Sequence, residues 1–298
     1  MTKFIRHDAQ EDGSNLNEPA ARDWKAELDL AFELADGRTR LIRRRQYGPL
    51  VVQRPFYPEE DGTCHVYLLH PPAGIVGGDR LHQVFDVSDG ARCVLTTPGA
   101  TKFYRSPMQK GSQHNTIVVG AGGTCEYLPQ ENIIFDGANA EIETRVTLAD
   151  DATFVGWDFF CLGRPAAKER FTTGSLGQRI EIVRNNDKIW FERFKLGGDS
   201  PLLAARYACA GQPVFGTMIY AGRLQDGSAE HVRNSLNIKT SDVKTSSVFS
   251  VSQLQHVVVC RYLGEQAEEG KNLFIQAWNV LRSICQSKSA CLPRIWAT

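Results

Sequence analysis

Glu141-Ile-Glu-Thr-Arg-Val-Thr-Leu148 alternates charged or polar side chains with apolar ones along its whole length. This period of two predicts a β-strand with one face toward a core and the other toward water, because successive side chains of a strand point to opposite faces. Similar stretches recur between turn sequences earlier in the chain. They are Trp24–Phe32, Thr63–Leu69, Ala91–Thr97 and Asn115–Val119. The first two-thirds of the chain is therefore predicted to be mainly β.

Turn sequences rich in Gly, Asp and Asn separate these strands at intervals of ten to twenty residues or so. That spacing is typical of a sandwich, a barrel or an irregular β-solenoid, and no fixed repeat period is present. The predicted fold is mainly β, an irregular helical β-sheet or two-layer β body. The turns are Asp36-Gly37, Asp61-Gly62, Asp89-Gly90, Gly120–Gly123, Asp136-Gly137, Asn185–Asp187 and Gly197–Asp199.

The pattern changes after about Gly211, where strand and helix signals alternate in the order β-α-β-β-α. Ser228 is the expected N-cap of the first helix. The second helix, Asn272–Arg282, is amphipathic, with Leu273, Ala277 and Leu281 on one face and Phe274 and Trp278 beside it. We therefore divide the chain into a flexible N-terminal segment (1–22), a β body (23–211) and a smaller α/β portion packed on it (212–298). The apolar end, Leu292–Thr298, is expected to dock on the body or on a partner.

Charge and composition exclude several classes of function. The 298 residues include 34 basic and 34 acidic side chains, so no net field attracts nucleic acid or an anionic membrane. No apolar run approaches the roughly 20 residues of a membrane span, and residues 1–17 are too polar for a signal peptide. A cytoplasmic protein is predicted. The eight cysteines form no CxxC pair, which argues for free thiols and against a zinc site.

Sequence signatures of catalysis are also missing. Gly77-Gly78-Asp79 has no Lys-Ser/Thr pair after it, no GxGxxG opens a helix, and Gly174–Gly177 does not have GxSxG spacing. These motifs therefore support neither nucleotide-dependent nor serine-hydrolase chemistry. Cys64 and His65 point to opposite faces of a strand and cannot share an ion, although His70 could approach Asp79 through the intervening turns. Two ligands do not make a tight metal site, so none is predicted.

Five carboxylates lie in apolar surroundings: Asp79, Glu131, Asp136, Asp158 and Glu192. A buried carboxylate is costly unless it is paired or faces water. Two interpretations remain open, ion pairs with arginines or a hydrophilic interior that cations could cross. The arginines expected as partners are Arg105, Arg164 and Arg193.

Six segments resemble, in order, those of the urease accessory protein family UreD, called UreH in some organisms. The resemblance runs from about Trp24 to the C-terminus. The segments are Gly48–Pro58, Leu69–Asp79, Thr97–Ser106, Leu128–Glu131, Trp157-Asp158 with Cys161–Pro165, and Leu292–Trp296.

The resemblance implies a non-enzymatic maturation factor for nickel urease, with a largely β fold. Its partners would be apo-urease and UreF, with UreG reached through UreF, and nickel would pass through an internal water-filled passage without a permanent cofactor. By the same resemblance, Asp79, Asp158 and Glu192 are expected to line this passage. The weaker candidates for its lining are His70, Glu131 and Asp136. Five residues are expected in the framework or in partner contacts: Tyr104, Arg105, Arg164, Arg294 and Trp296.

Two alternatives stay open at this point. The chain could hold urease and UreF in register without any metal transit, in which case neutralising Asp79, Asp158 and Glu192 leaves activation intact. A β-fold hydrolase or lyase acting on a polymer would instead use paired carboxylates and show turnover without a partner.

Overall fold

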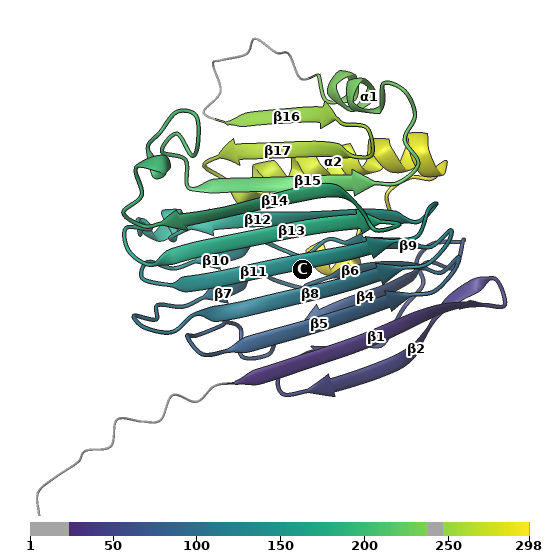
Figure 1. Cartoon of the computed structure of the whole chain (residues 1–298), viewed down its shortest axis with the longest axis horizontal. Coiled ribbons are helices and arrows are strands. Elements are labelled where there is room, and N and C mark those ends of the chain that lie inside the picture. The colour runs from purple at the N-terminus through teal and green to yellow at the C-terminus, as the bar shows by residue number, and fades with distance from the viewer. Residues whose placement is uncertain (1–23, 238–246, 298) are drawn as a thin grey trace, which may run out of the picture.

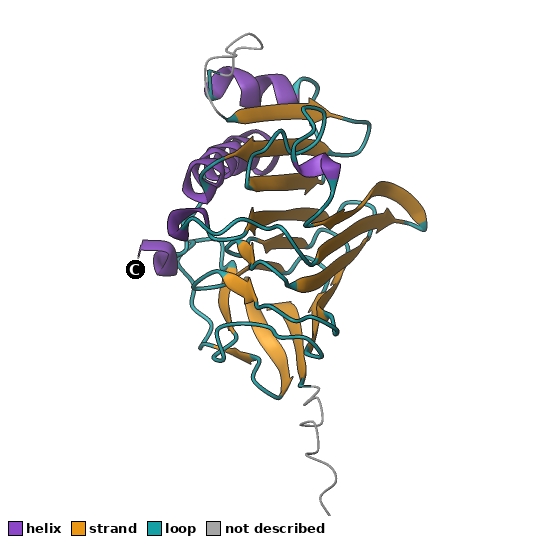
Figure 2. Cartoon of the chain, turned by 90° about the vertical axis from the view of Figure 1, so that its left-hand side faces the viewer, coloured by secondary structure: helices purple, strands orange, loops and turns teal. Residues whose placement is uncertain are grey.

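The computed structural model describes residues 24–237 and 247–297, and the predicted flexible segment 1–22 lies outside them. Strands dominate the described chain and form two sheets that lie face to face, with the two α-helices at the end of the molecule where β16 and β17 lie (Figures 1 and 2). The predicted mainly β, two-layer class is confirmed.

The first sheet has seven strands and its outer face is exposed to solvent. Its central strands β1, β5, β8, β11 and β13 are parallel to one another, whereas the edge strands β14 and β2 are antiparallel to their neighbours. In spatial order the strands are β14 (Asp187–Gly197), β13 (Ser175–Arg184), β11 (Asn139–Leu148), β8 (Gly111–Val119), β5 (Arg80–Val87), β1 (Lys25–Ala35) and β2 (Arg38–Tyr47).

The second sheet has ten strands and extends further along the molecule than the first. Two short strands, β7 (Thr101–Phe103) and β10 (Asn132–Ile134), join it through β12. The others, in spatial order, are β16 (Val248–Gln253), β17 (Val258–Gly264), β15 (Val214–Ala221), β12 (Thr153–Leu162), β9 (Thr124–Tyr127), β6 (Arg92–Thr96), β4 (Cys64–Leu69) and β3 (Val51–Val52).

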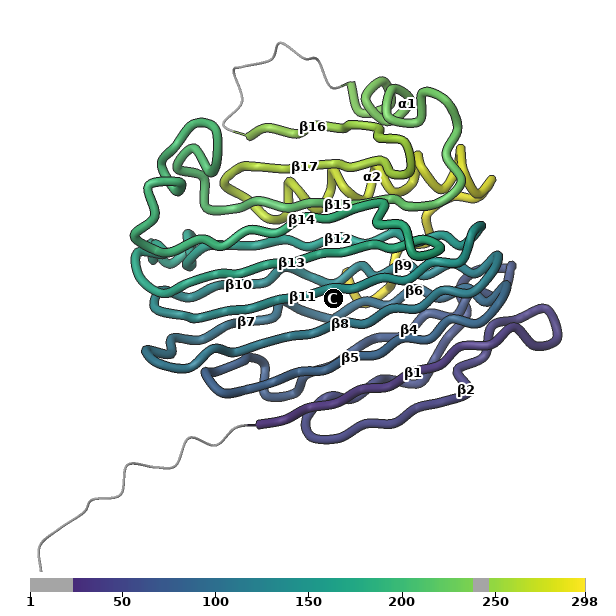
Figure 3. The backbone as a smooth tube through the Cα atoms, viewed as in Figure 1, coloured from purple at the N-terminus to yellow at the C-terminus, as the bar shows by residue number. Residues whose placement is uncertain are grey.

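The chain winds between the sheets as a solenoid. Strands β4, β6, β9 and β12 belong to the second sheet, and β5, β8, β11 and β13 alternate with them in the first (Figure 3). Each strand pairs in parallel with the strand one turn earlier. Winding stops where β14 and β15 pair antiparallel with β13 and β12. Parallel strands are therefore joined through the opposite sheet, without crossover helices.

The main core fills the space between the sheets. In β11 the alternation predicted at residues 141–148 is confirmed, because Ile142, Val146 and Leu148 are buried there and Glu141 and Arg145 are exposed. Strand β12 is buried on both faces, which explains its continuous apolar sequence. Its residues Phe154 and Phe160 face the other sheet, whereas Trp157 and Phe159 face a second core under helix α2.

Two α-helices, α1 (Ser228–Ser235) and α2 (Ala267–Gln286), follow in the predicted β-α-β-β-α order, and strands β15, β17 and β16 continue the second sheet. Ser228 is not the N-cap. Gly227, with φ of 73°, takes that position, and the Ser228 hydroxyl bonds backward to the Gln225 carbonyl oxygen at 2.7 Å. The buried face of α2 centres on Phe274, Ala277, Trp278 and Leu281, and Leu273 lies at its margin. The division at residue 211 stays a prediction.

The C-terminal segment docks on the body, as predicted. Its 3-10 helix, Arg294–Ala297, brings the Trp296 Nε1 to 2.9 Å from the Thr96 Oγ1, and the indole packs beside Trp157 and Trp278. Two further 3-10 helices are Pro165–Ala167 and Pro201–Leu203. Within the described ranges, no helix is long and apolar enough to cross a membrane. All eight cysteines are free thiols, and Cys64, Cys93, Cys125 and Cys260 are fully buried.

Candidate functional site

A ladder of polar side chains crosses the otherwise apolar space between the sheets. Gln83 in β5, Asn115 in β8 and Thr144 in β11 are register partners on adjacent parallel strands. The Gln83 amide donates to Asn115 Oδ1 at 3.0 Å, and the Asn115 amide donates to Thr144 Oγ1 at 3.0 Å. Gln113 adds a bond of 3.3 Å to the hydroxyl of Tyr127 in the opposite sheet. The interior therefore contains a hydrogen-bonded polar layer.

Asp158 continues this polar layer from the second sheet. Because side chains alternate along β12, Asp158 shares the interior face of that strand with Phe160. Its Oδ2 accepts a hydrogen bond of 3.1 Å from the amide of Gln178 in the first sheet. Burial raises the pKa of Asp158 to about 6; the Gln178 bond opposes that rise, and the charge of Glu192 adds to it. Asp158 is thus a buried carboxylate that changes charge near neutral pH.

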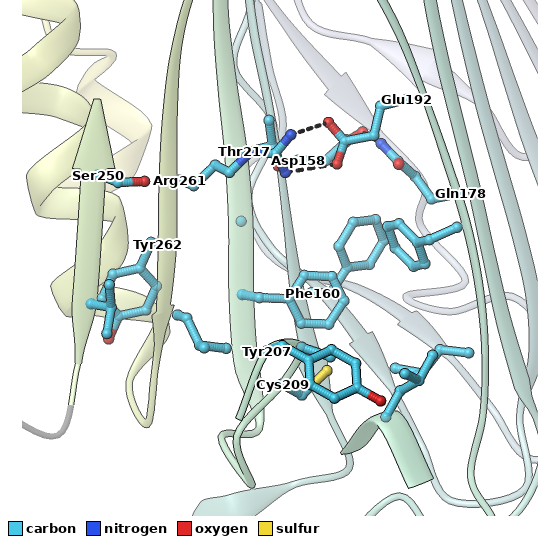
Figure 4. Close-up of a pocket in the computed structure, with 18 of the residues that line it drawn as sticks. Asp158, Phe160, Gln178, Glu192, Tyr207, Cys209, Thr217, Ser250, Arg261 and Tyr262 are labelled. Carbon is cyan, nitrogen blue, oxygen red and sulfur yellow. Dashed lines mark hydrogen bonds and ion pairs between the residues drawn. The ribbon is translucent and has the colours of Figure 1, made fainter. Parts of the chain in front are cut away.

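A cavity of about 400 Å³ opens on one side of Asp158. Three phenylalanines are among the residues that line it, and on its polar side Glu192 receives two hydrogen bonds of 2.9 Å from the Arg261 guanidinium (Figure 4). Tyr207, which is 87% exposed, stands at its border with solvent. The cavity therefore leads from the surface to the buried carboxylate.

A second, much smaller cavity of about 30 Å³ lies on the other side of Asp158. His70, Gln83, Gln113 and Tyr127 are among the residues that line it. Burial lowers the pKa of His70, and the charge of Asp79 opposes that shift, so the imidazole is held toward its neutral form. A volume of this size holds roughly one water molecule. Asp158 borders both cavities and joins them through its own carboxylate.

The sequence is similar to known proteins along most of its length. The sequence model of the UreD urease accessory protein family matches residues 25–297. The urease accessory protein UreD 2 of Brucella anthropi is 52% identical over 92% of this chain and 98% of its own length. UreD of Azoarcus sp. is 42% identical over 92% and 94%, and UreD of Cupriavidus necator is 38% identical over 96% and 98%. The chain belongs to the UreD family. Its relatives are named as accessory proteins, and a role in urease maturation follows from this membership.

The site residues predicted from the UreD resemblance separate into two groups in the structure. Asp158, Glu192 and His70 line the two cavities, whereas Asp79 and Glu131 line neither. Asp79 is buried, and its Oδ2 accepts a hydrogen bond of 3.0 Å from the Val76 backbone N–H in a tight turn. Glu131 is half-buried and lies near the Cys161 thiol, whose pKa burial raises to about 11, with a smaller contribution from the Glu131 charge.

Asp136 holds two strand connections together instead of lining either cavity. Its Oδ1 accepts hydrogen bonds from the backbone N–H groups of Thr172 and Thr173, at 2.7 and 2.8 Å, and from both of their hydroxyls. The bond from the Thr172 backbone N–H is the largest cause of the lowered pKa of Asp136, and burial opposes that shift. This geometry gives Asp136 a structural role.

The expected arginine partners were wrong. Glu192 pairs with Arg261, which the sequence analysis did not select, and Arg164 pairs with Glu169, five residues along the chain. Arg261 was missed because it lies on a strand that is distant from Glu192 in sequence, and Glu169 was missed because it was not among the five carboxylates considered. The Arg164 guanidinium also lies over the ring of Phe135, 4.6 Å from its centroid.

The other framework candidates differ in exposure. The Tyr104 ring packs edge-on against Phe135 with centroids 4.9 Å apart, so it belongs to the framework. Arg105 and Arg294 are exposed and offer their guanidinium groups to the surface. Trp296 is half-buried in the C-terminal contact described above.

A buried ion-pair network escaped the sequence analysis. Arg282 of α2 is fully buried and contacts Glu126 of β9 and Glu59 of the loop before β4. Burial favours the neutral acid of Glu59, but hydrogen bonds from His65 and Arg282 outweigh it and lower the pKa of Glu59 to about 2. The available signal was an arginine directly after Leu281 on the apolar face of an amphipathic helix.

One group of three potential ligands with mutually close ligand atoms occurs in the part of the chain that the structure describes. Ligand atoms of Glu59, His65 and Cys291 lie within 4.8 Å of one another. Both oxygens of Glu59 already accept hydrogen bonds from Arg282, and Lys288 lies 3.3 Å from one of them. These cations compete with any metal ion for the carboxylate. The predicted absence of a tight metal site stays a prediction.

Proposed function

We propose that this chain is a non-catalytic urease maturation factor that conducts nickel between its two β-sheets. In this proposal it binds apo-urease and UreF in the cytoplasm, and UreG, reached through UreF, supplies the ion. Family membership supports the maturation role, and the two cavities joined at Asp158 support the conducting role.

The position of Asp158 carries the proposal. It is the one carboxylate that borders both cavities, and its single protein hydrogen-bond donor in the described chain is a neutral amide, Gln178. Because no arginine or lysine neutralises it, its oxygens can accept a passing cation. Monodentate carboxylate and amide oxygens bind nickel weakly, and weak binding is what a conduit requires.

The smaller cavity sets a limit on how an ion would pass. It has about 30 Å³ of space, whereas six water molecules of hydration occupy on the order of 180 Å³ at ~30 Å³ each. In this conformation a fully hydrated ion does not fit. Nickel would therefore shed water at Asp158, or the side chains around His70 would move apart when the partners bind.

A scaffold without metal transit is the second candidate, and one observation favours it. Both carboxylate oxygens of Glu192 accept hydrogen bonds from Arg261. The guanidinium neutralises the charge of this carboxylate, which was predicted to line the passage, and this favours a structural role for it. If Glu192 and Asp158 contribute only to the stability of the fold, the chain would hold apo-urease and UreF in register while nickel takes another route.

Reconstitution of urease activation separates the two candidates. Apo-urease, UreF, UreG and nickel are mixed with wild-type chain or with Asp158→Asn, Asp158→Leu, Glu192→Gln or Asp79→Asn, and pull-down measures assembly in parallel. The matched control is Asp187→Asn, an exposed carboxylate on β14. A conduit predicts that both Asp158 variants lose most activation while assembly remains, with Asp158→Leu the more severe. Full activation of urease with Asp158→Leu would contradict nickel conduction through this chain and would favour the scaffold role.

A further inference from the structure

Four potential metal ligands form a row on the outer face of the seven-stranded sheet. Glu27 in β1, His82 in β5, His114 in β8 and Glu143 in β11 are direct register partners on consecutive parallel strands. They lie on the face opposite the interior, since Gln83 and Gln113, the sequence neighbours of the two histidines, line the smaller cavity. The row is therefore separate from the interior cavities by the thickness of one sheet.

The two imidazoles are close enough to share one ion. The ring centroids of His82 and His114 are 5.1 Å apart, and their planes differ by 11°. An ion about 2.1 Å from a ring nitrogen lies roughly 3.2 Å from the ring centroid. At that distance the observed separation corresponds to an angle of roughly 106° at the ion, close to tetrahedral. Because the ring planes are nearly parallel, each ring would have to rotate about its side-chain bonds to turn one nitrogen toward the ion.

A carboxylate stands on the side of His114 that faces away from His82. Glu143 Oε2 lies 3.6 Å from His114 Nδ1, and Arg179 and Arg145 approach the other oxygen at 3.5 and 3.8 Å. Such long, partly exposed ion pairs contribute little stability. Glu143 therefore supports His114 from its Nδ1 side, which leaves the Nε2 of that ring for an ion. The remaining positions of the coordination sphere are open to water, because the histidines border a surface hollow that includes Ser112.

Burial lowers the pKa of His82, and the neighbouring His114 adds to that shift. Lys25 and Arg80 act in the same direction, whereas Glu27 opposes it. A neutral imidazole has a lone pair for a metal ion. His82 is thus held toward the form that binds a metal.

We propose that His82 and His114 form an exchangeable outer site for a borderline divalent transition-metal ion such as Ni²⁺ or Zn²⁺, with Glu143 as a supporting residue beside His114. Two imidazole ligands suit such ions better than Mg²⁺ or Ca²⁺, which prefer oxygen ligands alone. The site does not depend on the proposed passage, since it lies on the other face of the sheet. The group Glu59, His65 and Cys291 is the competing location, and its carboxylate is already held by Arg282.

Equilibrium dialysis of the full chain against Ni²⁺ alone tests the proposal. Wild type is compared with His82→Asn/His114→Asn, with His256→Asn as an exposed-histidine control and with Cys291→Ser as a probe of the competing group. Loss of a direct ligand pair is expected to weaken binding by at least ~10-fold, the lower end of the effect of losing supporting residues. The two controls should bind as wild type does. Circular dichroism checks that each variant keeps its β structure.

Electron paramagnetic resonance of added Cu²⁺ gives a second readout, since coupling to two equivalent imidazole nitrogens is expected in wild type and should disappear in the double variant. Loss of both signals in the double histidine variant alone supports the site. Unchanged binding in that variant, loss in Cys291→Ser alone, or no binding by wild type would each overturn it.

Discussion

Arg282 in the C-terminal helix α2 and Glu126 in strand β9 form a bidentate ion pair across 156 residues of sequence. The Arg282 Nε lies 2.9 Å from Glu126 Oε1 and its Nη2 lies 2.5 Å from Oε2, with both side chains fully buried. The Trp278 indole donates to the same carboxylate at 3.0 Å, and the guanidinium also bonds to Glu59 and to the Ser289 carbonyl oxygen. The pair therefore fastens the helical portion to the solenoid.

Replacing Arg282 by Met should destabilise the protein by about 3–5 kcal/mol, because the buried Glu126 would lose its counter-ion and Glu59 would keep only Lys288. Urea unfolding followed by circular dichroism measures the loss. Adding Glu126→Gln to that variant should recover part of it, since one uncompensated charge is removed while an acceptor for Trp278 remains. The control is Arg145→Met, an exposed arginine with a 3.8 Å ion pair, which should change stability by less than ~0.5 kcal/mol. A similar small effect for Arg282→Met would contradict the fastening role.

Asp158 predicts a dependence of stability on pH. Its pKa is about 6 in the folded protein and 3.8 ordinarily, so the folded state binds more protons between these values. The free energy of unfolding therefore falls as pH rises from about 4 to above 6. Once Asp158 is fully ionised, the loss amounts to roughly 3 kcal/mol. Asp158→Asn removes the penalty and should be more stable than wild type, with roughly half of the gain at pH 5 and nearly all at pH 7.5. A gain that is equal at both pH values would exclude this account, and Asp187→Asn should show no gain.

The strands were predictable from local sequence, but their winding was not. The alternation at residues 141–148 reports which side chains of β11 face the core, and that depends only on strand geometry. The sheet that each strand joins depends on contacts with strands one solenoid turn away. Because those contacts are irregular in spacing, no repeat length disclosed them.

The candidate site was predictable to the same extent. Asp158 was found because a carboxylate between Trp157 and Phe159 must face something polar. Its donor Gln178 and the Glu192 partner Arg261 were missed, since each lies on a distant strand and neither is unusual in its own sequence. Asp79, like Asp158, is a carboxylate in an apolar stretch of sequence, yet it accepts a hydrogen bond within a turn. An apolar sequence environment therefore indicates that a carboxylate is buried but does not indicate its role.

Asp136 should affect stability and leave activation unchanged. Its Oδ1 accepts four hydrogen bonds from Thr172 and Thr173. A hydrogen bond to a charged acceptor contributes about 1.5–3 kcal/mol to stability. We expect Asp136→Ala to lower the free energy of unfolding by about 2 kcal/mol, and Asp136→Asn, which keeps one acceptor oxygen, by less. Thermal unfolding compares the two. Reduced urease activation per folded Asp136→Ala molecule would instead return this residue to the proposed passage.

The docking of the C-terminus depends on Trp296, whose indole N–H donates to Thr96 and whose ring lies 5.8 Å from that of Trp157. Trp296→Phe keeps an aromatic ring and should cost about 1 kcal/mol for the lost hydrogen bond. Trp296→Ala also removes the packing and should cost about 3 kcal/mol, the low end for a buried Trp because this one is half-buried. Chemical unfolding measures both, with Leu292→Ala, an exposed neighbour, as the control. Wild-type stability of Trp296→Ala combined with loss of the complex with apo-urease or UreF would show that Trp296 serves a partner and contributes nothing to the fold.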